Sequence, residues 1–147
     1  MATDSLAGYI KTTLTEYAGI SDAGAVSVDF LGMMPTRFSV RGEPSGAVVR
    51  RYLNGDTIRR YTFALEGMCD TISDADRQKN NALFEGLSGW MDKITKTRQL
   101  PSMANGARAM ALESTGSVYL AREEESGDAA AYIMQAALTY YQQAQTD

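Results

Sequence analysis

The chain has 147 residues, of which 44% are apolar and 22% are charged, and its formal net charge is −4. These values are typical of a globular chain, and we expect one domain over residues 1–147. The overall charge does not favour nucleic acid as a partner, because an acidic chain is repelled by phosphates.

Several kinds of chemistry have little support in the composition. The chain has no histidine, which is the commonest general base and metal ligand. Cys69 is the only cysteine, so an internal disulfide is excluded and a reducing compartment is favoured. No apolar run approaches the ~20 residues that span a membrane, and the N-terminus is polar. We therefore expect a protein made in the cytoplasm, without membrane contact.

The first predicted element is a helix over residues 4–18, whose start Asp4 or Ser5 could cap. Two strands are predicted next, because apolar and polar residues alternate over residues 25–31 and 36–42. In the helix predicted over residues 4–18, the apolar residues recur at helical spacing: Leu6, Tyr9, Ile10, Leu14 and Tyr17.

The segment 48–67, VVRRYLNGDTIRRYTFALEG, predicts a β-hairpin that turns at Asn54-Gly55. A two-residue turn places Arg50 opposite Arg59. A three-residue turn places Arg51 opposite Arg59 and Arg50 opposite Arg60. Either register sets like charges against each other, which lowers stability. We therefore expect a role for the four arginines outside hairpin stability.

The clearest helix is predicted over residues 73–97, with Ser73 as its N-cap and Pro101 beyond its end. Two segments around Gly116 could pair as a second hairpin. The last segment, 129–143, is ambiguous, since its alanines favour a helix and its apolar alternation favours a strand. The helix predicted over residues 73–97 has an apolar stripe along one side, formed by Leu83, Leu87, Trp90, Met91 and Ile94.

This order of elements predicts an α+β fold, with one mixed, mainly antiparallel sheet and two main helices packed on one face. We expect no catalytic, cofactor-binding or metal-binding residues, because no such motif is present. The carboxylates Asp70, Asp74 and Asp76 are interpreted as helix capping. The run Glu123, Glu124 and Glu125 is either a solvated turn or a complementary patch for the arginines of a neighbouring copy.

The arginine hairpin leaves two interpretations open. It is either a ribbon whose arginines reach water, or an arm that contacts a protein or a nucleic acid. Composition does not choose between these partners, because the donor fork of arginine suits carboxylates and phosphates equally.

The sequence resembles the phage minor capsid proteins that belong with the tail terminators of long-tailed phages. The resemblance lies in the order of VDFLGMMPTRFSV (28–40), RRYLNGDTIRRYTFALEG (50–67), LFEGLSGWMDK (83–93), Leu100-Pro101 and YIMQAALTYYQ (132–142). It covers residues 25–143 and favours a strand for the last segment.

The resemblance implies a structural virion protein, not an enzyme, at the junction of tail and neck. Such proteins form a hexameric ring that caps the tail tube, stops its polymerisation and joins the tail to the head-side connector. DNA passes through the lumen without sequence-specific binding. The expected interface residues are Arg50, Arg51, Arg59 and Arg60, the turn residues Asn54 and Gly55, and Glu123, Glu124 and Glu125.

Three other functions remain as alternatives. The first is a neck or head-completion protein that binds the connector. The second is a nucleic-acid-binding module that uses the arginine hairpin, where basic and aromatic residues interleave. The third is a small enzyme that works through paired carboxylates with perturbed pKa values. The resemblance does not give the host or the type of tail.

Overall fold

The structure is a computed structural model, and it describes residues 6–17, 26–28, 37–42, 48–70, 73–103, 106–116, 118–123 and 129–144. Within these residues the order of elements is α1 (Leu6–Leu14), β1 (Val26–Val28), β2 (Arg37–Gly42), β3 (Val48–Arg51), β4 (Thr57–Asp70), α3 (Asp74–Lys96), β5 (Ala107–Ser114), β6 (Tyr119–Glu123) and β7 (Ala129–Gln142). This is the predicted order, and it confirms the α+β class.

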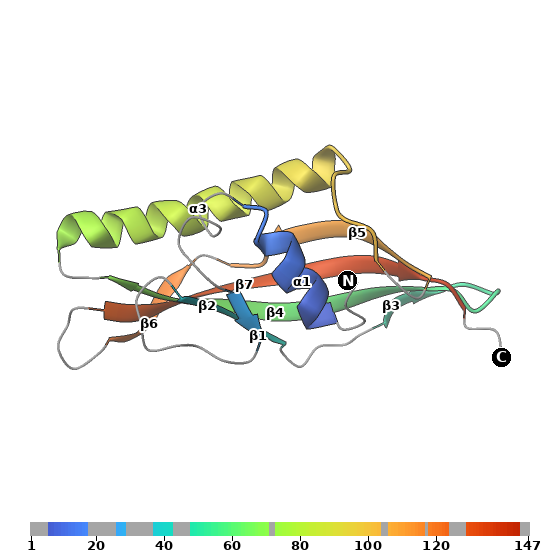
Figure 1. Cartoon of the computed structure of the whole chain (residues 1–147). Helices are drawn as coiled ribbons and strands as arrows, with labels where there is room; N and C mark the ends of the chain where they lie inside the picture. Colours follow the sequence, from blue (N-terminus) through green and yellow to red (C-terminus); the bar gives the residue numbers. More distant parts are fainter. Residues whose placement is uncertain are drawn as a thin grey trace.

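The strands form one seven-stranded sheet in the order β1-β2-β4-β7-β5, with β3 beside β4 and β6 beside β7. The pair β1 and β2 is parallel, and the other pairs are antiparallel. Strands β4 and β7 have 14 residues each and pair along their whole length, from Thr57 opposite Gln142 to Asp70 opposite Ala129. This long pair is the centre of the sheet and links its two ends (Figure 1).

Both helices lie on the same face of the sheet, as predicted (Figure 1). Alternate residues of the strands point toward the helices and are buried there, because successive side chains of a strand point to opposite faces. Phe63 and Leu65 of β4 and Leu138 of β7 are fully buried in this layer. The same core cluster includes residues of both helices, among them Ile10, Leu14, Phe84, Leu87 and Met91. We call the opposite face of the sheet, turned away from α1 and α3, the outer face.

Helix α3 begins where its sequence predicts. The Ser73 hydroxyl accepts a hydrogen bond from the Asp76 amide at 3.1 Å, and the Asp76 carboxylate accepts one from the Ser73 amide at 3.3 Å. This reciprocal pair is a capping box, which confirms capping as the role of Asp76. The helix ends at Lys96, before Pro101, and Arg98 then adopts a φ of 56°. Proline therefore does not end this helix.

The last third of the chain differs from one prediction. Strands β5 and β6 do not pair with each other as a hairpin. Both pair with β7 along the same edge, β5 ending at Ser114 opposite Ala136 and β6 beginning at Tyr119 opposite Ile133. Their shared partner explains the difference, since β7 is long enough to hold both. The ambiguous last segment is therefore a strand, paired on both sides.

Cys69 is buried, as expected for a small apolar side chain. No helix among the described residues combines the length and the apolar character needed to cross a membrane. The expected caps Asp4 and Ser5 lie outside the described residues.

Candidate interaction surface

The hairpin of β3 and β4 turns at Asn54-Gly55, as predicted, but in a register that neither alternative gave. Arg50 lies opposite Ile58 and Arg51 opposite Thr57. The Tyr52 amide donates to the Asp56 carbonyl at 2.9 Å, so the loop consists of three residues, 53–55. The expectation that like charges face each other is therefore wrong.

Gly55 and Asn54 form this turn, Gly55 through its backbone conformation and Asn54 through a side-chain hydrogen bond. Gly55 has a φ of +94°, a left-handed conformation that glycine adopts without a side-chain clash. The Asn54 side-chain carbonyl accepts a hydrogen bond from the Asp56 amide at 3.0 Å, closing an Asx turn. Asn54 and Gly55 thus form the turn, and they would contribute to a contact by positioning the side chains beside them.

The four arginines lie on two sides of the sheet. The pairing register places Arg50 and Arg60 on the outer face and Arg51 and Arg59 on the helix side. Arg50 and Arg51 are exposed, whereas Arg59 and Arg60 are half-buried. The Arg59 Nε donates to the Thr57 hydroxyl at 3.0 Å, and a nitrogen of Arg60 lies 4.0 Å from a Glu113 carboxylate oxygen. The structure therefore divides the predicted arginine cluster into an exposed pair and a half-buried pair.

Two tyrosines and a fifth arginine, none of them among the expected interface residues, join this surface. On the outer face the Arg50 guanidinium lies 5.5 Å from the centre of the Tyr52 ring. The Tyr52 ring lies 5.9 Å from that of Tyr141, and the Arg108 guanidinium lies 5.4 Å from the Tyr141 ring. Each distance is within the range of a cation–π or aromatic contact. The alternation of β7, which sets Tyr140 inward and Tyr141 outward, was the available signal for Tyr141.

Asp56 connects the hairpin tip to the end of β7. Its carboxylate accepts hydrogen bonds from the Tyr141 hydroxyl, from the Ala144 amide at 2.7 Å and from the Asn54 side-chain amide at 3.1 Å. The hydrogen bond from Tyr141, followed by that from Ala144, lowers the pKa of Asp56 below its ordinary 3.8. The same bond to Asp56 raises the pKa of Tyr141 above 10.0. These bonds tie the tip to a strand about 85 residues away in sequence.

The lowered pKa of Asp56 predicts how the tip responds to acid. Because the folded pKa lies below the unfolded one, the carboxylate stabilises the tip fully above pH 3.8 and loses this effect as the pH falls through the lowered value. In an NMR titration we expect the Gly55 amide signal to move with a midpoint below 3.8. Asp56→Asn, which has no titrating group, should remove this transition. A midpoint at or above 3.8 in the unchanged chain would contradict the assignment.

The tip also exposes apolar side chains. Leu53 has a relative exposure of 111%, and Val49, which lies where the register of β3 shifts, has 60%. Tyr52 is 38% exposed between them in sequence. The hairpin extends at the end of the sheet nearest the C-terminus (Figure 1). The surface therefore combines exposed apolar groups with exposed cations, a composition suited to protein contacts.

The acidic residues proposed as the complement lie elsewhere. Glu123 pairs with Ala130, whereas Thr57 at the base of the hairpin pairs with Gln142. These β7 partners are twelve residues apart, or roughly 40 Å at ~3.4 Å per residue. Asp70, opposite Ala129, is also at that distant end. Glu124 and Glu125 lie outside the described residues. Within one copy, the arginine hairpin and Glu123 therefore do not meet.

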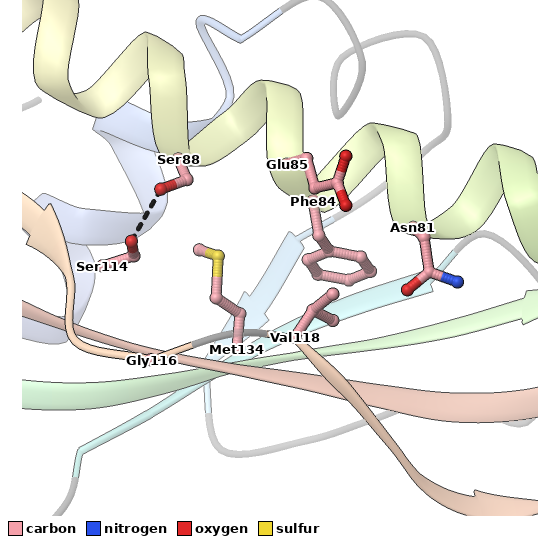
Figure 2. A pocket seen from close by; sticks show the side chains of 8 residues that line it. All are labelled: Asn81, Phe84, Glu85, Ser88, Ser114, Gly116, Val118 and Met134. Carbon is pink, nitrogen blue, oxygen red and sulfur yellow. Dashed lines mark hydrogen bonds between the residues drawn. The ribbon is translucent and has the colours of Figure 1, made fainter.

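A pocket of about 470 Å³ opens between α3 and the point where β5 gives way to β6 (Figure 2). Phe84, Val118 and Met134 supply its apolar lining. Asn81 and Glu85 of α3 are exposed at its rim, and Gly116 lies on the strand side. The hydroxyls of Ser88 and Ser114 share a hydrogen bond of 2.6 Å beside it. The pocket lies where β5 has ended at Ser114 and β6 begins at Tyr119, and beside it the Thr115 amide donates to the Gln135 carbonyl of β7 at 2.9 Å.

Among the residues that the structure describes, no three cysteine or carboxylate side chains gather where they could hold a metal ion. The described residues present two features: a hairpin tip that exposes apolar and cationic groups and is hydrogen-bonded to the end of β7, and a separate pocket partly lined by apolar side chains.

The sequence was also compared with known proteins. No protein-family model matches the chain, and no curated protein matches it.

Proposed function

We propose that this chain is a structural virion protein that acts as a tail terminator. Copies would form a ring, expected to be a hexamer, that caps the tail tube, stops its polymerisation and joins the tail to the head-side connector. The protein would then be located at the tail–neck junction of a phage particle. The resemblance of the ordered segments within residues 25–143 supports this proposal, and the α+β fold is of the kind that the resemblance implies.

The observation that carries the proposal is the hairpin tip. The tip exposes Val49, Tyr52 and Leu53 close together, beside two exposed arginines, and such a cluster of apolar groups is typical of an interaction surface. Asp56 and its three hydrogen-bond donors hold this tip in one conformation before any partner binds. A surface fixed in advance loses less conformational entropy on binding. These features favour an assembly contact.

The test is electron microscopy of the chain mixed with the tail-tube protein of the phage that encodes it, beside tube protein alone. Rings at the tube ends, and tubes that become shorter as more of the chain is added, are the expected result. Uncapped tubes of unchanged length would overturn the proposal. Binding to the connector protein instead would then favour the neck protein.

A second candidate function is single-strand nucleic-acid binding, which the cluster of Arg50, Tyr52, Tyr141 and Arg108 favours. Fluorescence anisotropy with a labelled single-stranded oligonucleotide distinguishes it. Binding that weakens steeply with added salt and is lost in Tyr52→Ala would support this alternative.

A further inference from the structure

We infer that Leu53 of one copy inserts into the pocket between α3 and the β5–β6 interruption of a second copy. This inference deepens the proposed function, because it names the contact that would join neighbouring subunits of the ring. It rests on two features that are otherwise unexplained, a fully exposed leucine and a pocket with an apolar floor.

Leu53 cannot occupy the pocket of its own chain. The pocket lies over Met134, whereas the base of the hairpin lies beside Gln142. Eight residues of an extended strand separate these positions, or roughly 27 Å. The tip extends beyond Gln142, away from the pocket, and the bonds to Asp56 hold it there (Figure 1). The occupant must therefore come from another molecule.

The pocket suits the tip in size and in chemistry. Its volume of about 470 Å³ is within the ~300–1,000 Å³ of typical small-ligand pockets, so one leucine side chain fits with room to spare. The side chains of Phe84, Val118 and Met134 point into the space between α3 and the strands (Figure 2). Phe84 and Met134 are each 1% exposed, so a leucine that enters would rest on a narrow apolar floor bordered by polar groups, and the part of it that leaves water there is stabilised.

Charge complementarity favours a second copy of this chain as the occupant. Glu85 is exposed at the rim of the pocket, and Arg50 and Arg51 are exposed three and two residues before Leu53. When the leucine enters, the arginine on the side of the hairpin that meets Glu85 comes to the rim, where this carboxylate stabilises it. Rim charges of this kind set the orientation of binding more than its strength.

The symmetry of such a contact follows from its two halves. The hairpin tip and the pocket are different surfaces of the same molecule, so the contact can repeat head-to-tail from copy to copy. Head-to-tail contacts close into rings or grow into open filaments, depending on the rotation between neighbours. The ring of the proposed function requires the head-to-tail form, whereas a reciprocal exchange of tips between two copies would give a two-fold dimer, and the mass of the assembly in solution distinguishes the two.

The experiment uses two cysteine variants on separate chains. Leu53→Cys keeps a small apolar side chain at the tip and is activated as a mixed disulfide with thionitrobenzoate; the Gly116→Cys thiolate can then displace thionitrobenzoate and join the chains. In the matched control, the second chain carries Gly89→Cys instead of Gly116→Cys. Both glycines have open space for an added Cβ, but Gly89 does not line the pocket. Cys69 is buried and stays unchanged.

We expect Gly116→Cys to react at least about tenfold faster than Gly89→Cys, the preference given by about 1.4 kcal/mol of contact energy. Each rate is first divided by that of the same variant with a small activated disulfide, which removes differences in thiol reactivity. A second change on the tip chain, Arg50→Glu with Arg51→Glu, should reduce the preference through repulsion by Glu85. Equal normalised rates for Gly116→Cys and Gly89→Cys, both in solution and on capped tubes, would overturn the inference.

The two proposals fail separately in this design. If the chain caps tubes but shows no preference for Gly116→Cys there, the inference is wrong and the proposed function stands. If the preference is present but tubes remain uncapped, copies of the chain bind one another as inferred and the tail-terminator function is wrong.

Discussion

Replacing Phe84 by alanine is expected to lower the free energy of unfolding by about 3–5 kcal/mol, the usual cost of removing a buried phenylalanine. Phe84 is 1% exposed, and its ring centre lies 6.2 Å from those of both Phe38 and Tyr132. The substitution joins the vacated space to the pocket and removes aromatic contacts between α3 and two strands. Urea denaturation followed by circular dichroism measures the change.

The control for this prediction is Leu53→Ala. Leucine is fully exposed at that position, so its truncation should leave the free energy of unfolding within about 0.5 kcal/mol. The loss in free energy of unfolding for Phe84→Leu should lie between those for Phe84→Ala and Leu53→Ala, because leucine keeps part of the buried volume. A loss below about 1 kcal/mol for Phe84→Ala would show that this ring does not carry the packing between α3 and the sheet.

Removing the two exposed arginines, Arg50→Gln with Arg51→Gln, is expected to leave the fold intact and to reduce tube capping about tenfold or more. Neither side chain is buried, and the aromatic contact of Arg50 is worth about 0.5–1 kcal/mol at an exposed site. At the inferred contact between copies, by contrast, the arginine that meets Glu85 of the neighbouring copy would lose this ion pair, which sets the orientation of binding. The fraction of capped tubes, counted by electron microscopy at several salt concentrations, measures the effect.

A matched control removes two exposed cations elsewhere, Lys93→Gln with Lys96→Gln near the end of α3. It makes the net charge of −4 more negative by the same two units as the arginine variant, so a general charge effect would act on both variants alike. Arg59 and Arg60 are less suitable targets, because they contact Thr57 and Glu113 within the chain. If the lysine variant loses capping to the same extent, the hairpin arginines have no specific role.

Local sequence signals predicted the elements well where the contacts that form them are local. Ser73 caps α3 through residues three positions away, and the alternation of Phe38 and Val40 places both in the core. The last segment could not be assigned from local propensity alone. Its strand conformation depends on pairing with β4, some seventy residues earlier, and on pairing with β5 and β6 at the other edge.

The candidate site was only partly predictable for the same reason. The position of the Asn54-Gly55 turn could be read from the sequence, but the strand register beside it could not. That register places Asp56 where Tyr141 and Ala144, from a distant part of the chain, donate hydrogen bonds to it. These contacts are invisible in a reading of residues 48–67 alone. Leu53 was overlooked because an apolar residue inside a hairpin is usually counted toward the core. The pocket was missed because β5 and β6 were expected to pair with each other.

The edges of the sheet limit how copies of this chain can join. β3, β5 and β6 each carry a register shift, between Val48 and Arg50, Ala109 and Ala111, and Leu120 and Arg122, and β1 has three residues. Interrupted and short edges are poor templates for an added strand. Growth by continuous main-chain pairing, the route to amyloid, is therefore obstructed at both margins. We therefore expect copies of the chain to join through side-chain contacts, which salt and dilution can weaken, and the assembly to be reversible.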